Sequence, residues 1–503
     1  MKKKKLFLTA LLTTSIGLFS CGGGNDSGSS NSYSPTGSVY LPYMASLDFV
    51  DPITGSVVNV ESKKVLYAEN FIKALKFDKK SYEVENDYVV YITDEGNEKG
   101  KIFKVSLAEC APQPVQISNV SDACSVVDSY NDNNVSYLIV QTAGNDGQCE
   151  TSDDKNVFVN TNMSAGTSPI DMSHVKRVID DFMDYNNLKI TGFLILNTSN
   201  KLQKCDTNLQ NCSDILSANN SNSVDDLGHY DINRDEYYLC VNDYWFRIFP
   251  DGNYRNTNAS CSIQSGWTAD KDYVYFYTED LSGNKTIKKL SKANDTVVSL
   301  YTTTNTVYIQ GNTIDYVIIE ELNSSTGTYY LKAINKSNGS VVDIKSSNQD
   351  INSVTNYKHL VLYSYYDGSN LRACYWDGAT NQNNCNSNNS YWGGGFVKRS
   401  GNISFDYSDG EMDMELEPYK FILVENYKDI YSVNPDNPSE KTLIGSLPDR
   451  YTAPAVDGLG SSGLLMAQDK NNGYRYDIFL IDVDKKVLKQ ITNTPNKSEE
   501  AIW

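Results

Sequence analysis

The chain has 503 residues, of which 63 are acidic and 44 are basic, and its formal charge at pH 7 is −19. A surface of that sign repels phosphate backbones and anionic lipid heads, so we expect no nucleic-acid partner. After the first twenty residues, no apolar run approaches the ~20 residues that span a bilayer, which predicts a soluble body.

The N-terminal segment predicts an exported lipoprotein. A basic stretch, Lys2–Lys5, precedes an apolar run, Leu6–Phe19, of signal-peptide length. The Leu-Phe-Ser-Cys sequence at 18–21 resembles a bacterial lipobox, whose cysteine becomes the lipidated first residue of the mature chain. We therefore expect a signal peptide at 1–20 and lipidation at Cys21. An ordinary secretory signal with an incidental cysteine is the alternative.

Residues 21–37 predict a flexible, lipid-tethered linker. The stretch Gly22–Ser34 is rich in glycine and serine and has almost nothing to bury. Gly22 directly after the cysteine favours an outer-membrane address in a bacterium with two membranes. The membrane is then a partner through the lipid anchor, and loss of four lysines with the signal brings the formal charge to about −23.

Apart from Cys21, nine cysteines lie in the exported part, where an oxidising compartment favours disulfides. Proximity in the sequence suggests four pairs, namely Cys110 with Cys124, Cys205 with Cys212, Cys240 with Cys261, and Cys374 with Cys385. Cys149 is left over. Zinc is the competing interpretation, but the cysteines do not form Cys-x-x-Cys pairs and the chain has only three histidines.

A strand–turn–strand unit recurs ten times along the chain, at intervals of ~40–60 residues. The copies begin near residues 47, 102, 157, 202, 246, 287, 330, 371, 430 and 478. Each follows an apolar strand such as Tyr88–Ile92 or Tyr273–Tyr277. Four short strands in such a repeat are typical of a β-propeller blade, which buries its faces against neighbouring blades.

The fold class is therefore all-β, with four-stranded antiparallel blades in one domain at 38–503. Ten units exceed the usual ~4–8 blades. We expect about eight blades, with one or two irregular hairpins counted in error. An unusually large ring or two smaller rings are the alternatives, and no linker separates two halves.

One segment competes with the all-β interpretation. Its apolar residues fall at helical spacing, at Met172, Val175, Val178, Ile179, Phe182 and Met183. The segment is either a short helix over a blade edge or an outer strand that leads into the next inner one.

The last stretch resembles the TolB-type propeller repeat. It carries Ile478-Phe479, Asp482, Ile491-Thr492, Glu499-Glu500 and Trp503, and a second copy begins at Trp267-Thr268-Ala269-Asp270. The α/β domain that precedes the propeller in TolB is absent, so TolB's protein partners are not carried over. The resemblance implies that Trp503 belongs to the innermost strand of a blade. We expect Ala501, Ile502 and Trp503 to pair with the 39–60 segment and close the ring.

The best candidate for a metal site is the loop from Ala143 to Asp154. Asn145, Asp146, Glu150, Asp153 and Asp154 bring many hard oxygens together, which suits Ca²⁺. The spacing is not that of an EF-hand, and a solvated acidic turn is the alternative. Calcium is the only cofactor that the sequence suggests.

The chain lacks the common catalytic signatures, since it has no Gly-x-Ser-x-Gly elbow, no His-Glu-x-x-His and no Walker loop. Aromatic residues around Trp376, Tyr391 and Trp392, beside Gly393–Gly395, could stack on a sugar or a peptide, or fill the space between blades. We expect a monomeric, non-catalytic module that binds or scaffolds an envelope protein or glycan. A polysaccharide hydrolase or lyase with acidic channel residues is the alternative.

Overall fold

The structure is a computed structural model that describes residues 40–78, 81–108, 112–132, 135–184, 189–225, 228–231, 234–261, 266–402, 404–405, 414–415, 417–493 and 497–502. Within these residues it contains β-strands and three short 3₁₀ turns, η1 (Gly96–Glu98), η2 (Ser221–Ser223) and η3 (Lys470–Asn472). In the same residues, no helix has the length and hydropathy needed to cross a membrane.

The strands form four-stranded antiparallel blades, whose strands are named below from the innermost to the outermost. The innermost strands of blades 9 and 10 also pair with each other, so these two blades share one eight-stranded sheet. Blade 1 consists of β43 (Glu500–Ala501), β1 (Leu41–Met44), β2 (Leu47–Val50) and β3 (Val57–Glu61). Blade 2 consists of β4 (Val65–Asp78), β5 (Ser81–Thr93), β6 (Ile102–Ser106) and β7 (Val115–Ile117). Blade 3 consists of β8 (Ala123–Asn131), β9 (Ser136–Thr142), β10 (Lys155–Asn160) and β11 (Ile170–Asp171).

The middle of the chain continues this order. Blade 4 consists of β12 (Val175–Asp184), β13 (Lys189–Asn197), β14 (Lys201–Cys205) and β15 (Ser213–Ser217). Blade 5 consists of β16 (His229–Asp231), β17 (Glu236–Val241), β18 (Tyr244–Ile248) and β19 (Tyr254–Ser260). Blade 6 consists of β20 (Trp267–Ala269), β21 (Tyr273–Glu279), β22 (Lys285–Ser291) and β23 (Val297–Thr303). Blade 7 consists of β24 (Thr306–Asn312), β25 (Tyr316–Asn323), β26 (Thr328–Asn335) and β27 (Val341–Ser347).

Three blades complete the set. Blade 8 consists of β28 (Asn352–Tyr357), β29 (Leu360–Asp367), β30 (Asn370–Asp377) and β31 (Gln382–Cys385). Blade 9 consists of β32 (Ser390–Val397), β36 (Pro418–Glu425), β37 (Asp429–Asn434) and β38 (Asn437–Ser446). Blade 10 consists of β39 (Tyr451–Leu459), β40 (Ser462–Asp469), β41 (Arg475–Asp482) and β42 (Val487–Gln490).

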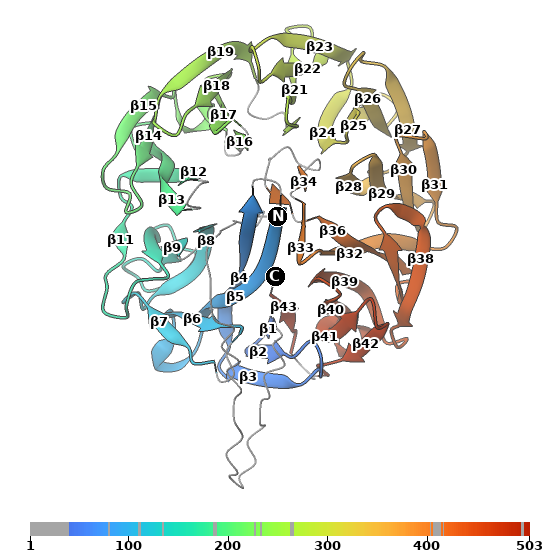
Figure 1. The fold of residues 1–503 in the computed structure, drawn as a ribbon. Helices are drawn as coiled ribbons and strands as arrows, with labels where there is room; N and C mark the ends of the chain where they lie inside the picture. Colours follow the sequence, from blue (N-terminus) through green and yellow to red (C-terminus); the bar gives the residue numbers. More distant parts are fainter. Residues whose placement is uncertain are drawn as a thin grey trace.

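The described residues thus form ten blades of a β-propeller, arranged around a common centre (Figure 1). The all-β expectation is confirmed. The expectation of about eight blades is too low, because each of the ten strand–turn–strand units found in the sequence belongs to a separate blade.

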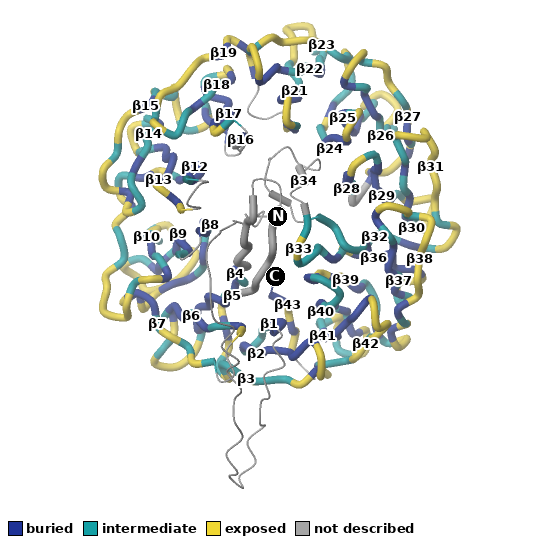
Figure 2. The backbone as a smooth tube through the Cα atoms, in the orientation of Figure 1, coloured by how far each residue is buried: buried dark blue, intermediate teal, exposed yellow. Residues whose placement is uncertain are grey.

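Among the described side chains, apolar cores lie between consecutive blades. One core joins Ile318 and Leu331 of blade 7 to Val361 and Trp376 of blade 8. A similar core joins Leu464 of blade 10 to blade 1. Figure 2 shows exposed residues along the outer rim and buried residues inside the blades. This arrangement follows from period-2 strands whose two faces both meet a neighbour.

The segment with helical spacing is a strand, so its interpretation as a helix is wrong. β12 pairs along its length with β13, and its register shifts between Val175 and Arg177 and again between Val178 and Asp180. Each β-bulge adds a residue and moves the next apolar side chain out of strict alternation. Two closely spaced bulges therefore place the apolar residues of this strand at the spacing that is typical of a helix.

The predicted pairing of the C-terminal segment with the first strands is present. β43 runs antiparallel to β1, with Ala501 opposite Tyr43, and the N–H of Ile502 donates to the carbonyl of Pro42 at 3.1 Å. Ile502 is buried in the core between blades 1 and 2. Trp503 lies outside the described residues.

A connection that the sequence did not suggest links two distant blades. β33 (Ser400–Asn402), which follows blade 9's innermost strand, pairs with residues 81–83 of β5 in blade 2. The same excursion contains β34 (Ser404–Phe405) and β35 (Met414–Glu415). In Figure 1 this pairing lies near the middle of the ring.

Strand direction produces two distinct faces of the propeller. Because the strands of a blade alternate in direction, the turns that join its first to its second strand and its third to its fourth strand share one face, which we name face A. The remaining turns and the connections between blades lie on face B. Tyr40 lies on face A, where its N–H donates to the carbonyl of Leu107 at 3.3 Å.

Candidate functional site

The predicted calcium loop lies between β9 and β10 and is organised by its own hydrogen bonds. Asp153 Oδ2 accepts the N–H of Asn145 at 2.6 Å, and Asp154 Oδ2 accepts the N–H of Glu150 at 2.8 Å. The Thr151 hydroxyl, followed by loop N–H groups, holds the pKa of Asp153 below its ordinary value. Asp146 Oδ1 accepts the N–H of Gln148 at 2.9 Å. Across the described residues, no group of three or more acidic, histidine or cysteine side chains is placed to hold a metal. Calcium binding at this loop stays a prediction.

The cysteines require one correction. Cys124 is bonded to Cys149, the residue that seemed left over from the local pairs, and not to Cys110, which lies outside the described residues. Cys149 is farther away in the sequence, but the β9–β10 loop returns it to the start of β8, with a Cα–Cα distance of 5.6 Å. The other three predicted pairs are present. Every cysteine that the structure describes is in a disulfide, as suits an oxidising compartment.

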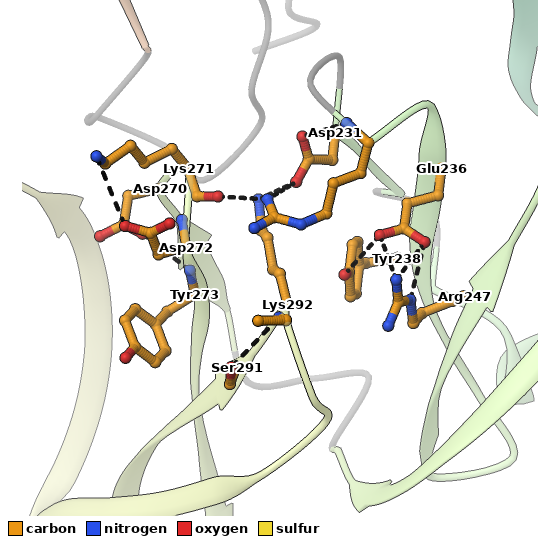
Figure 3. A network of polar contacts seen from close by, with 12 residues as sticks. Asp231, Glu236, Tyr238, Arg247, Asp270, Lys271, Asp272, Tyr273, Ser291 and Lys292 are labelled. Atoms are coloured by element: carbon orange, nitrogen blue, oxygen red, sulfur yellow. Dashed lines mark hydrogen bonds and ion pairs between the residues drawn. The ribbon is translucent and has the colours of Figure 1, made fainter.

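A buried network of charges joins blades 5 and 6 (Figure 3). Lys292, in the turn after β22, lies 3.2 Å from Asp231 Oδ2 at the end of β16, and both side chains are fully buried. Arg234 lies 2.9 Å from the same oxygen and also donates to the carbonyl of Lys271 at 2.5 Å. Burial lowers the pKa of Lys292 to about 8, although Asp231 opposes that shift. The network connects two blades through fully buried side chains, so we assign it a structural role.

The same arrangement recurs between blades 6 and 7. Lys336, in the turn after β26, lies 2.8 Å from Asp270 Oδ2 and donates to Asn312 Oδ1 at 2.5 Å. Burial alone would raise the pKa of Asp270, but the Lys336 ammonium holds it below its usual value. Lys292 and Lys336 occupy corresponding positions in consecutive blades, and each reaches the blade before it.

The junction between blades 8 and 9 differs, because it contains an open groove of about 620 Å³ on face A. The inner parts of the two blades pack together through Leu360 and Leu362 on one side and Phe421 and Leu423 on the other. Farther out, the groove lies between β30 and β31 of blade 8 and the β37–β38 turn of blade 9. Its volume is typical of a ligand site.

Tyrosines and side-chain amides line this groove, which we call the 8–9 groove. Tyr375 lies opposite Asn384, and Asp377 lies opposite Gln382, so all four share one face of blade 8. Tyr357 lines the inner end, and the residues Pro435, Asp436, Asn437, Pro438 and Ser439 line the side formed by blade 9.

Charge in the 8–9 groove is largely compensated. Lys358 Nζ donates to Asp436 Oδ1 at 2.7 Å across the junction. Burial opposes protonation of Lys358, but Asp436 and Tyr357 outweigh it and raise its pKa. Asp377 accepts the Ala379 N–H at 2.9 Å and the Thr380 hydroxyl at 2.8 Å.

The tyrosine hydroxyls of the groove remain hydrogen-bond donors. Burial, followed by the charge of Asp377, raises the pKa of Tyr375, and burial raises that of Tyr357. Both phenols are therefore protonated at neutral pH. The groove presents ring faces, hydroxyls and amides, and little net charge.

The aromatic residues singled out in the sequence have different positions. Trp376 is 1% exposed and fills the core between blades 7 and 8. Tyr391 is partly buried against the core between blades 9 and 10. Trp392 lines a second, smaller cavity at the inner part of the junction between blades 8 and 9. Sequence reasoning missed the residues of the 8–9 groove, which carry no motif.

A polysaccharide hydrolase or lyase uses two carboxyl groups, and two neighbouring carboxyl groups, those of Glu320 and Asp350, lie at the junction between blades 7 and 8. Burial, followed by a hydrogen bond and charge from Asp350, raises the pKa of Glu320 to about 8. Glu320 Oε2 also accepts from the Gln310 side chain at 3.1 Å. Its side chain is enclosed between blades 7 and 8, where the residue is 4% exposed.

No protein-family model matches the chain, and no curated protein matches it. Solved structures similar to it include TolB from Acinetobacter baumannii, with 12% identity and a TM-score of 0.23. The matched part covers 52% of this chain and 66% of the TolB chain, which is just under two thirds. They also include a dihydro-heme d1 dehydrogenase, with 10% identity over 69% of this chain and 72% of that chain and a TM-score of 0.37.

An oligogalacturonate lyase from Vibrio parahaemolyticus is similar as well, with 9% identity over 72% of this chain and 83% of the lyase and a TM-score of 0.29. TolB is thus among the similar structures, as the terminal repeat implied. At these identities the similarity concerns the fold alone, and the propeller itself is established by the strand order.

Proposed function

We propose that the chain is a cell-envelope lipoprotein whose propeller binds a neutral glycan in the 8–9 groove. The observation that supports this proposal is the combination of tyrosine rings and side-chain amides in an open space of about 620 Å³. Propellers serve many functions, so the proposal depends on this groove and not on the fold.

The chemistry of the groove suits a polyhydroxylated ligand. The ring of Tyr375 offers an apolar surface for the C–H face of a sugar, and its protonated hydroxyl can donate to a sugar oxygen. Gln382 and Asn384 each carry both a donor and an acceptor, which matches the dual character of sugar hydroxyls. The groove thus combines stacking with directional hydrogen bonds.

Charge favours a neutral sugar over an acidic one. The ammonium of Lys358 is paired with Asp436, and Asp377 adds a negative charge. The formal charge of the whole chain, −19, repels polyanions at longer range. A uronate polymer would meet unfavourable charge both on approach and in the groove.

The proposed anchor is the lipidated Cys21 in the outer membrane, followed by the glycine- and serine-rich linker. Tyr40, the first described residue, lies on face A, to which the 8–9 groove also opens. A short tether would therefore start from the face that carries the groove. The disulfides are compatible with this location outside the cytoplasm.

The rival function, a polysaccharide hydrolase or lyase, needs two carboxyls within reach of a bound chain, about 5–9 Å apart. Glu320 is only 4% exposed between blades 7 and 8, which favours a structural role for it. A scaffold for an envelope protein remains the second binding alternative.

A glycan array with purified full-length protein tests the proposal. We expect binding to neutral glycans and an affinity loss of about fivefold or more in Tyr375→Ala, because an aromatic stacking surface is worth about 1 kcal/mol or more. Tyr254→Ala, which removes an exposed tyrosine of blade 5 outside the groove, is the control. Absence of glycan binding, with capture of an envelope protein instead, would favour the scaffold. Release of new reducing ends from a bound glycan would favour the enzyme.

A further inference from the structure

A second cavity, of about 260 Å³, lies between blades 8 and 9 near their inner strands, and we call it the inner pocket. Its walls are Leu362 and Thr355 of blade 8, Trp392, Phe396, Val397, Pro418 and Phe421 of blade 9, and Asp457 of blade 10. It is separate from the 8–9 groove, whose lining residues it does not share.

The inner pocket exists because one wall lacks side chains. β32 contains three successive glycines, and it is hydrogen-bonded to β36 on one side and to β39 in parallel on the other. Gly394 has a φ of +111°, and a Cβ at this position would lie 1.9 Å from the carbonyl oxygen of Val456. Only glycine fits so close a contact. The glycines that allow this pairing also leave space beside Trp392.

Trp392 is held in one orientation. Its Nε1 donates to the carbonyl of Cys374 in blade 8 at 3.0 Å. The edge of its ring meets Phe421, with centroids 6.4 Å apart and an interplanar angle of 72°. The indole is therefore fixed before any ligand arrives, which limits the entropy lost on binding.

The lining of the inner pocket combines aromatic rings with one acidic side chain. Trp392, Phe396 and Phe421 supply the rings, and Asp457, which is exposed, supplies a carboxylate. Its described lining contains no lysine, arginine or histidine. Aromatic faces attract cations through the ring quadrupole, with tryptophan the strongest, and a nearby carboxylate adds direct attraction. The overall negative charge of the chain raises the local concentration of cations.

We propose that the inner pocket binds the alkylammonium group of a small ligand, with Trp392 as the stacking surface and Asp457 as the counter-charge. The apolar walls exclude a strongly hydrated metal ion, whose water shell they cannot replace. An alkylammonium group presents methyl or methylene surface together with a positive charge, and so matches both parts of the lining. This inference stands apart from the glycan proposal, because the two sites share no residue.

Choline and its neutral carbon isostere, 3,3-dimethylbutan-1-ol, provide a matched pair of probes. Titration of each into full-length protein, followed by calorimetry, should show saturable binding of choline and at least about tenfold weaker binding of the isostere. Equal binding of the two would show that only apolar contact operates and would overturn the proposal, as would no binding of choline.

Two variants place the site. Asp457→Asn should weaken choline binding several-fold and leave the isostere unchanged, whereas Asp367→Asn, an exposed carboxylate on face B, should change neither. Trp392→Ala should abolish binding of both probes. If thermal unfolding shows that Trp392→Ala is not folded, Asp457→Asn decides, and full retention of choline affinity in it contradicts the proposal. Tyr375→Ala should leave choline binding intact even if the glycan proposal fails.

Discussion

Neighbouring blades are joined in two different ways, as a comparison of the junctions on either side of blade 6 with the junction between blades 8 and 9 shows. Around blade 6, buried lysines extend from one blade into the previous one and end on buried or nearly buried aspartates. Between blades 8 and 9, the ion pair of Lys358 and Asp436 is exposed, and two cavities lie in the interface. The first kind of junction joins neighbouring blades through buried ion pairs, and the second contains the two cavities to which we assign ligands in our proposals.

The largest expected effect comes from breaking a buried pair. Lys336→Met removes the ammonium from Asp270 and should lower the free energy of unfolding by about 3–5 kcal/mol, because a carboxylate is left buried without its counter-charge. Urea denaturation measures the change. The double variant with Asp270→Asn should regain a substantial part of the loss, and a single variant as stable as the wild type would contradict the role assigned to this junction.

A smaller loss is expected where the innermost strands of blades 9 and 10 are joined by backbone hydrogen bonds, in addition to the side-chain core between these blades. Gly394→Ala should cost about 2–3 kcal/mol, because it combines an unfavourable φ with a collision against the Val456 carbonyl. Gly147→Ala is the matched control, since that glycine also has a positive φ but no neighbour within 4 Å of a Cβ. Similar melting temperatures for the two variants would show that the parallel pairing tolerates a side chain.

The carboxyl pair between blades 7 and 8 should make that junction sensitive to pH. The pKa of Glu320 is raised from 4.5 to about 8, so its contribution to stability is fully present below about 4.5 and is lost as the pH rises towards 8. Glu320→Gln should therefore be more stable than the wild type at pH 8–9, by roughly 1–3 kcal/mol, and its stability should depend less on pH. Melting temperatures at pH 5 and pH 9 test this, with Glu279→Gln, an exposed carboxylate on β21, as the control.

The smallest effect is expected at the exposed Lys358–Asp436 ion pair between blades 8 and 9. Lys358→Ala should change the free energy of unfolding by less than about 1 kcal/mol, because water and salt screen the Lys358–Asp436 pair. In high salt, the difference in the free energy of unfolding between Lys358→Ala and the wild type should disappear. A loss as large as that of Lys336→Met would mean that the two kinds of junction do not differ in the way described.

The blades could be predicted from the sequence because each repeat carries its own alternation of apolar and polar residues. Their number was underestimated because the usual size of a propeller outweighed the ten units in the chain. The bulges of β12 were missed because they change the period of apolar residues without any glycine or proline to mark them.

The groove could not be predicted because its walls come from different repeats. Tyr375 and Asn437 belong to neighbouring blades, and neither residue type is unusual in a strand or a turn. The buried lysines did leave a signal, since Lys292 and Lys336 follow Ser291 and Asn335 at the same point of consecutive hairpins. Alignment of the repeats would have found this signal. The disulfide of Cys149 depends on how one loop returns to its blade, which spacing does not reveal.

The pairing of Met44 with Glu500 determines when folding can finish. A chain that emerges N-terminus first presents β1 early, yet its innermost neighbour, β43, is made only after blades 2 to 10. Until then, the backbone groups of β1 on that edge are open to any other strand, including one from another chain. Blade 1 is therefore begun first and completed last. Every chain that is interrupted before β43 has an unpaired edge at β1, to which another strand can add.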